Sequence, residues 1–211
     1  GAELAWAPRN KGYKVQRIYQ GDPWDPDQHA PLIEPGAGLR EGDLVLAING
    51  HRLTRDHGPG AALRNLGGHE VELTVRSGKA SPRRFTVRTL RSEVALCYRD
   101  WVRQQRAYVH DKTGGTVGYV HIPDMMGNGY AEFHRGWLRE LHRPALLIDV
   151  RYNGGGHVSQ LILEKLARRR LGYEVMRHGE PEPFPTDCVL GPMAAVTNES
   201  AGSDGDIFSH T

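Results

Sequence analysis

The spacing of apolar residues changes once along the chain, and this change limits the possible folds more than any other feature. Up to about residue 90, apolar residues alternate with polar ones or form runs of strand length. Four segments show this pattern: 12–19, 43–49, 70–76 and 84–90. From Leu96 the spacing becomes helical. We therefore expect a small β-rich domain over residues 1–92 and a second domain over residues 93–211.

The second domain alternates strand-like and helix-like segments. Predicted strands cover 117–122, 145–150 and 192–197, the last two as buried strands, and predicted helices cover 130–141 and 158–166. Strands that alternate with helices are typical of a layered α/β domain with crossover connections. The expected fold class is thus an α/β domain preceded by a small β-rich domain.

Charge and composition exclude several classes of partner. The chain has 27 Lys and Arg against 25 Asp and Glu, a net charge of +2, which is too balanced to attract nucleic acid or an anionic membrane. Basic clusters at 82–84 and 167–170 have no interleaved aromatics and are read as solvated faces. Apolar runs such as 145–148 are far too short to span a bilayer.

The two cysteines, Cys97 and Cys188, are far apart and belong to no Cys-x-x-Cys motif. No signal peptide is visible, and we expect a cytoplasmic location. The 11 histidines lack the His-Glu-x-x-His spacing of a metal site, and we expect neither a metal nor a cofactor.

A turn motif in the first domain resembles a known module. Residues 39–53, LREGDLVLAINGHRL, place a glycine, an acid and an Asn-Gly turn in order around one strand, which resembles the signature of a PDZ domain. Such modules accept an extended peptide as an added edge strand, and the resemblance implies a groove near residues 12–15. The module either binds a peptide there or only packs against and orients its neighbour.

Ser203 lies in the segment 198–208, NESAGSDGDIF, between a predicted strand and an apolar pattern typical of a helix. A serine at a helix start is either a capping residue or, since the free N–H groups are close, a nucleophile. Asp204 and Asp206 are read as acids of the first helical turn rather than as calcium ligands.

A second loop, residues 153–156 (Asn-Gly-Gly-Gly), also follows a predicted buried strand and precedes a helix. Its glycine amides can form a concave donor surface. Both loops should emerge at the carboxyl ends of their strands, where a serine and an amide nest together would suit acyl transfer. A phosphate site is the competing interpretation, but the loop lacks Gly-Lys-Ser/Thr and Gly-x-Gly-x-x-Gly.

Four segments, 118–125, 149–161, 171–174 and 197–208, in this order behind a PDZ-like module, resemble the tricorn proteases. That family belongs to the carboxyl-terminal processing group of serine peptidases, which have a crotonase-like α/β fold. The resemblance implies that Ser203 is the nucleophile and that the amides of Gly156 and Asp204 form the oxyanion hole. It also implies that Glu174, where the family usually has Asp, lines a pocket for a basic side chain.

The resemblance further implies a cytoplasmic enzyme that assembles into hexamers and shortens peptides produced by a larger protease. Its histidine base and the glutamate that orients it would lie outside these 211 residues, so the chain alone should be inactive. Of the histidines present, His157 adjoins the glycine loop and is read as a lining residue. The alternative function is a non-catalytic peptide-binding scaffold that uses the PDZ groove.

Overall fold

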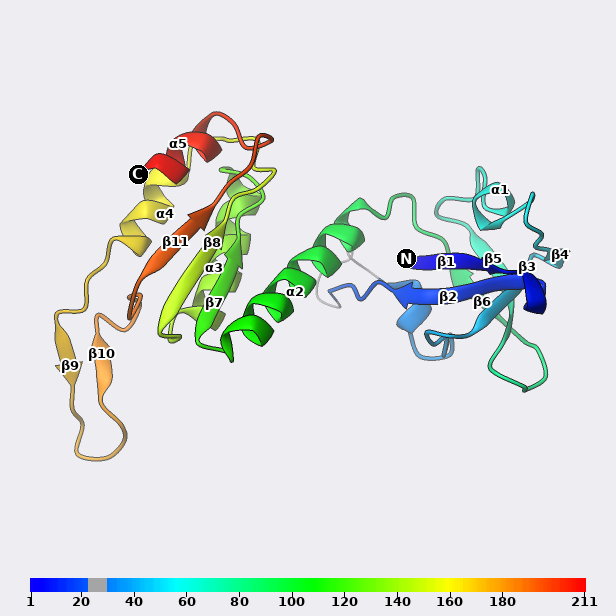
Figure 1. The fold of residues 1–211 in the computed structure, drawn as a ribbon, viewed down its shortest axis with the longest axis horizontal. Helices are drawn as coiled ribbons and strands as arrows, with labels where there is room; N and C mark the ends of the chain where they lie inside the picture. The colour runs from blue at the N-terminus through cyan, green and yellow to red at the C-terminus, as the bar shows by residue number, and fades with distance from the viewer. Residues whose placement is uncertain (23–29) are drawn as a thin grey trace. The chain divides into compact units, whose positions relative to one another are not determined.

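The computed structural model describes residues 1–22 and 30–211, which form two compact units, Gly1–Trp101 and Val102–Thr211 (Figure 1). The first unit is built on an antiparallel sheet of order β1-β2-β3-β5-β6, with β4 paired to β3. Its strands are β1 (Ala2–Ala7), β2 (Gly12–Ile18), β3 (Leu44–Ile48), β4 (His51–Arg52), β5 (Glu70–Arg76) and β6 (Arg83–Arg88). Within the described part of this unit, three short helices accompany them: η1 (Pro8–Asn10), η3 (Pro31–Ile33) and α1 (Pro59–Ala62).

All four strands predicted for the first domain are confirmed, whereas β1 and β4 were not predicted. Helix α1 begins at Pro59 and is short, because Leu63 has left helical geometry and Asn65 has a positive φ of 62°. The core contains buried Val15, Val45 and Val75, each no more than 3% exposed.

The second unit contains a parallel sheet of order β11-β8-β7. Its strands are β7 (Val117–His121), β8 (Ala145–Asp149) and β11 (Met193–Val196). Its helices are α3 (Gly127–Glu140), α4 (Ser159–Leu166) and α5 (Asp204–His210), and α2 (Val94–Thr113) runs across the boundary between the units. A separate hairpin of β9 (Gly172–Glu174) and β10 (Glu182–Phe184) projects from this unit (Figure 1).

The predicted alternation of strands and helices in this unit is confirmed, and so is the α/β class. One expectation is wrong: β11 is not buried, since three of its four residues are exposed. In the described part of the chain β11 pairs only with β8, so it forms an edge of the sheet. Helix α3 begins earlier than predicted because the Asp124 carboxylate accepts hydrogen bonds from the Met126 and Gly129 N–H groups.

The core of the second unit lies between the parallel sheet and its helices. Phe133 and Trp137 of α3 are at most 1% exposed and pack with Val120 of β7 and Ile148 of β8. Across residues 1–22 and 30–211, no helix combines the length and apolarity needed to cross a membrane. The carboxyl edge of this sheet carries the loops described next.

Candidate active site

Three loops meet at the carboxyl edge of the parallel sheet. The Met125 N–H donates to the Gly155 main-chain oxygen at 2.9 Å, and the Gly202 N–H donates to the Asn153 oxygen at 3.0 Å. A Cβ added to Gly155 would lie 2.7 Å from the Ser203 Cβ and 3.0 Å from the Asp204 nitrogen. The expected convergence of the glycine loop and the serine loop is therefore observed.

Ser203 has an uncommon backbone conformation, with φ at 55° and ψ at −130°. A positive φ in a residue with a Cβ costs on the order of 1–3 kcal/mol, and such conformations cluster at functional sites. The residue occupies the cap position of α5, yet its hydroxyl makes no capping hydrogen bond. The capping interpretation of Ser203 is thus wrong, and its exposed hydroxyl has no partner among the described residues.

The two main-chain amides singled out by the sequence adjoin this serine. Within the described residues, neither the Gly156 N–H nor the Asp204 N–H donates a hydrogen bond. Gly156 has a φ of 152°, and a Cβ there would lie 2.0 Å from the Met125 oxygen, so only glycine fits. Free amides next to an exposed hydroxyl are the components that acyl transfer requires.

Asn153 ties the three loops together, a role that its sequence motif did not reveal. The side chain is fully buried; its Nδ2 donates to the Ile122 oxygen at 3.0 Å, and its Oδ1 accepts from the Gly155 N–H at 2.9 Å. Its main-chain oxygen accepts from Gly202. The only sequence signal for this role is a polar residue between a buried strand and a glycine run.

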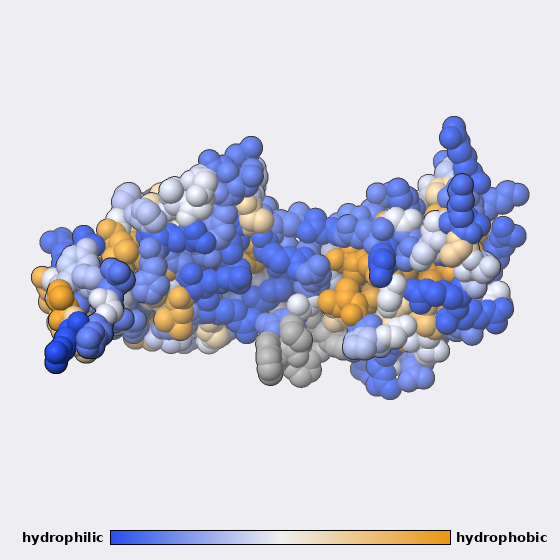
Figure 2. Space-filling view, turned by 90° about the horizontal axis from the view of Figure 1, so that it is seen from below, coloured by the Kyte–Doolittle hydropathy of each residue, from blue (hydrophilic) through white to orange (hydrophobic). Residues whose placement is uncertain are grey.

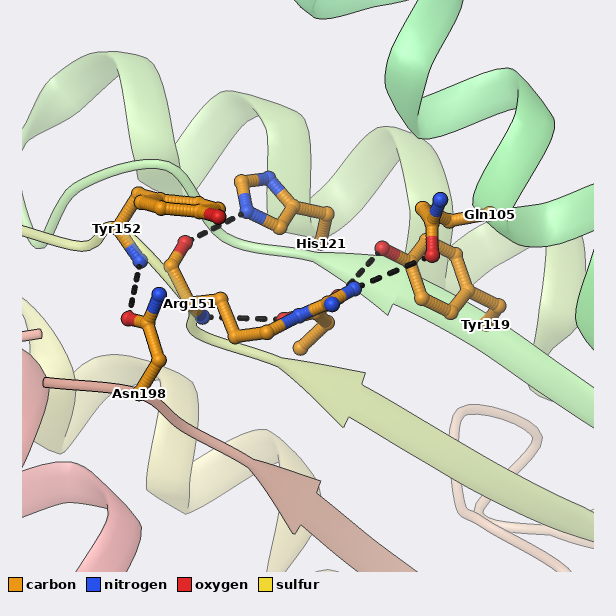
Figure 3. Close-up of polar contacts among 7 residues, drawn as sticks. Gln105, Tyr119, His121, Arg151, Tyr152 and Asn198 are labelled. Atoms are coloured by element: carbon orange, nitrogen blue, oxygen red, sulfur yellow. Dashed lines mark hydrogen bonds and ion pairs between the residues drawn. The ribbon is translucent and has the colours of Figure 1, made fainter. Parts of the chain in front are cut away.

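A polar network around the buried carboxylate of Asp149 lies at the carboxyl end of β8 (Figure 3). The Arg151 guanidinium donates to both carboxylate oxygens of Asp149, and Tyr119 donates to Asp149 Oδ2 at 2.7 Å. Arg151 also donates to Gln105 Oε1 at 3.2 Å. Burial by itself raises the pKa of Asp149, but the hydrogen bonds from Arg151 and Tyr119 outweigh burial and hold that pKa below its usual value. The network holds Arg151, which lies between the end of β8 and the glycine loop.

His121 is the histidine nearest this network, and it is 5% exposed. Its Nε2 lies 3.1 Å from the Arg151 main-chain oxygen (Figure 3). Burial lowers the pKa of His121, so the ring is neutral near pH 7. Neither His121 nor the exposed His157 makes a hydrogen bond to Ser203 in the described part of the chain.

Glu174 is not brought to the serine loop. It ends β9, is exposed, and lies in the hairpin at the opposite end of the second unit from α5 (Figure 1). The same hairpin exposes large side chains: Leu171, Tyr173, Val175, Met176 and Phe184. Figure 2 shows orange, hydrophobic surface at that end of the unit.

Among the residues that the structure describes, no group of three or more His, Cys, Asp or Glu could hold a metal ion. Asp204 and Asp206 lie in the first turn of α5, as predicted.

In the first unit, β2 pairs with β1 on one edge and β3 on the other, so residues 12–15 have no free edge for an added strand. The first unit also contains an apolar pocket of about 480 Å³, which is lined by Leu4, Leu63 and Val87 among others.

Comparison with known proteins agrees with this arrangement. Residues 1–92 match the tricorn protease PDZ domain, and residues 116–211 match peptidase family S41. A putative tricorn-like protease C-terminal subunit of Sulfurisphaera tokodaii is 44% identical over 210 residues, covering 100% of this chain and 24% of that protein. A tricorn protease homolog of Saccharolobus solfataricus is 43% identical over 209 residues, covering 99% of this chain and 19% of that protein.

The crystal structure of the tricorn protease superposes with a TM-score of 0.89 at 38% identity, over 99% of this chain and 20% of that one. The chain spans between 19% and 24% of the length of these relatives. With both of its units matched in order, the chain belongs to the tricorn protease family, carrying a tricorn-type PDZ domain followed by a peptidase family S41 domain.

Proposed function

We propose that this chain carries the nucleophile and the oxyanion-binding loops of a serine peptidase. Ser203 is the nucleophile, and the N–H groups of Gly156 and Asp204 stabilise the oxyanion. The observation that supports this most strongly is the strained backbone of Ser203, whose hydroxyl caps nothing and lies beside unpartnered amides. Membership of the tricorn protease family agrees with it.

The chemistry proceeds in two steps. The Ser203 oxygen attacks the peptide carbonyl carbon, a C–O bond forms, and the C–N bond breaks while the serine proton passes to the departing amine. Water then cleaves the ester, which releases the acid and restores the hydroxyl. Each oxyanion donor contributes roughly 2.7–4 kcal/mol to the barrier reduction.

The proton is carried by a histidine that a glutamate orients, both from outside these 211 residues. The substrates are peptides released by a larger protease, cut after basic residues that Glu174 recognises. For this, Glu174 must approach the serine when substrate or further polypeptide is bound. The catalytic unit has a crotonase-like fold, and the enzyme works in the cytoplasm as a homo-oligomer.

The test compares the 211-residue chain with the complete polypeptide that contains it, on a peptide with a basic residue before the cleaved bond. The complete polypeptide should turn it over, whereas the chain alone and the Ser203→Ala variant of the complete polypeptide should not. Activity that survives Ser203→Ala in the complete polypeptide would remove the basis of the proposal.

A peptide-binding scaffold is the competing function, and the apolar pocket of the first unit is the observation that favours it. A serine-directed fluorophosphonate distinguishes the two functions. An enzyme should be labelled at Ser203 in the complete polypeptide, and a scaffold should stay unlabelled while still binding apolar peptides.

A further inference from the structure

The strained backbone of Ser203 is held from both sides. On the amino-terminal side, the Gly202 N–H donates to the Asn153 main-chain oxygen at 3.0 Å. On the carboxyl-terminal side, the Ser203 main-chain oxygen accepts hydrogen bonds from the Asp206 and Ile207 N–H groups, and the Asp204 side chain binds Ser159. Asn153 and Ser159 belong to the segment that also supplies the glycine loop.

Both carboxylate oxygens of Asp204 accept a hydrogen bond from Ser159. The Asp204 Oδ1 accepts a hydrogen bond from the Ser159 hydroxyl at 2.6 Å, and its Oδ2 accepts from the Ser159 main-chain N–H at 3.2 Å. Hydrogen bonds to an ionised carboxylate are shorter and stronger than neutral ones. Ser159 is the first residue of α4 and is only 6% exposed, so water competes little for this contact.

We propose that Ser159 is a positioning residue for the peptidase reaction. It binds the Asp204 carboxylate and, together with the two α5 hydrogen bonds to the Ser203 oxygen, fixes the orientation of the Ser203–Asp204 peptide, whose N–H is the proposed oxyanion donor. This inference rests on the proposed function and adds to it a residue that touches neither the substrate nor the reacting atoms. Asp204 then has two roles: its main-chain N–H binds the oxyanion, and its side chain binds Ser159 of α4.

The same two hydrogen bonds would also cap the N-terminus of α4, which is a purely structural role. The two roles predict different measurements. A cap that is lost lowers stability and the amount of folded enzyme, but leaves the turnover of each folded molecule unchanged. A displaced oxyanion donor lowers kcat and leaves KM nearly constant, because the donor acts mainly in the transition state.

The experiment uses the complete polypeptide and measures kcat, KM, the rate of fluorophosphonate labelling of Ser203 and the thermal midpoint. Ser159→Ala should lower kcat and the labelling rate together by about 10- to 100-fold, with KM changed by no more than about threefold. Ser159→Thr keeps the hydroxyl and should recover most of the loss. The matched control is Ser209→Ala, which removes a hydroxyl bonded only within α5 and should leave kcat unchanged.

The outcomes separate this inference from the function on which it rests. Full kcat in folded Ser159→Ala, or a loss that Ser159→Thr does not reduce, would overturn the positioning role. If Ser203→Ala abolishes turnover while Ser159→Ala leaves kcat intact, only the positioning role fails. If Ser203→Ala itself stays active, the proposed function fails first.

Discussion

The main-chain oxygen of Asn153 accepts a hydrogen bond from the Gly202 N–H at 3.0 Å, which joins the loop after β8 to the loop after β11. The two residues are far apart in sequence and follow neighbouring parallel strands. This contact sets the distance between the glycine loop and Ser203. The predictions about the site follow from it.

The approach of Gly155 to Ser203 predicts that even one methyl group will disturb the site. Gly155→Ala places a Cβ 2.7 Å from the Ser203 Cβ, at a φ of 95° that alanine rarely adopts. We expect a loss of stability of about 1–3 kcal/mol and a large fall in kcat of the complete polypeptide. Gly154→Ala is the matched control, because a Cβ there meets nothing within 4 Å. Equal activity of the two variants would contradict the close packing.

Loss of the Asn153 amide should loosen all three loops. Asn153→Ala leaves the buried Ile122 oxygen and the Gly155 N–H without partners, which should cost on the order of 2–4 kcal/mol. Chemical denaturation of the chain measures this cost. Asn128→Ala removes an exposed amide bonded only to Asp124 and should cost less than about 1 kcal/mol. A similar cost for both variants would argue against the tie between the loops.

Glu140 predicts a stability effect away from the site. Its carboxylate is 1% exposed and lies 2.8 Å from His110 Nε2, 2.7 Å from Arg143 Nε and 3.5 Å from Arg106 Nε. Glu140→Gln removes the negative charge of the carboxylate around which these three basic side chains gather. Since the basic side chains are partly exposed, we expect a loss of about 2–3 kcal/mol in the free energy of unfolding.

A surface ion pair provides the comparison for Glu140. Glu72 lies 3.6 Å from Arg84 with a side chain 39% exposed, so Glu72→Gln should cost less than about 1 kcal/mol. A Glu140→Gln variant as stable as Glu72→Gln would show that the buried carboxylate contributes little.

His121 predicts a pH dependence of stability. Because burial lowers its pKa in the folded state, the unfolded chain binds more protons than the folded chain once the pH falls below about 6.5. The contribution of neutral His121 is therefore complete above pH 6.5 and is lost below it, at no more than about 1.4 kcal/mol per pH unit. In His121→Gln this slope should disappear from denaturation curves measured between pH 7 and 5.

The exposed His142 serves as the control, and His142→Gln should keep the slope. An unchanged slope in His121→Gln would mean that another group dominates the loss of stability in this pH range.

Local patterns in the sequence determined most of the secondary structure. Alternation and strand-length apolar runs predicted four strands of the first unit, β2, β3, β5 and β6, and the change to helical spacing at Leu96 located α2, because periodicity reflects which side of each element is buried. The glycine loop at 153–156 and the loop that carries Ser203 were predicted at strand ends for the same reason.

The sequence predicted that the glycine loop and the serine loop converge, whereas the tertiary structure decided which residues make the contacts between them. Burial of β11 was predicted wrongly, because a run of apolar residues does not reveal whether its strand lies at the centre or the edge of a sheet. The contacts of Asn153 with Gly202 and of Ser159 with Asp204 join residues more than 40 positions apart. Such contacts depend on strand order and register, which no local pattern encodes, whereas the elements themselves depend on neighbours within a few residues.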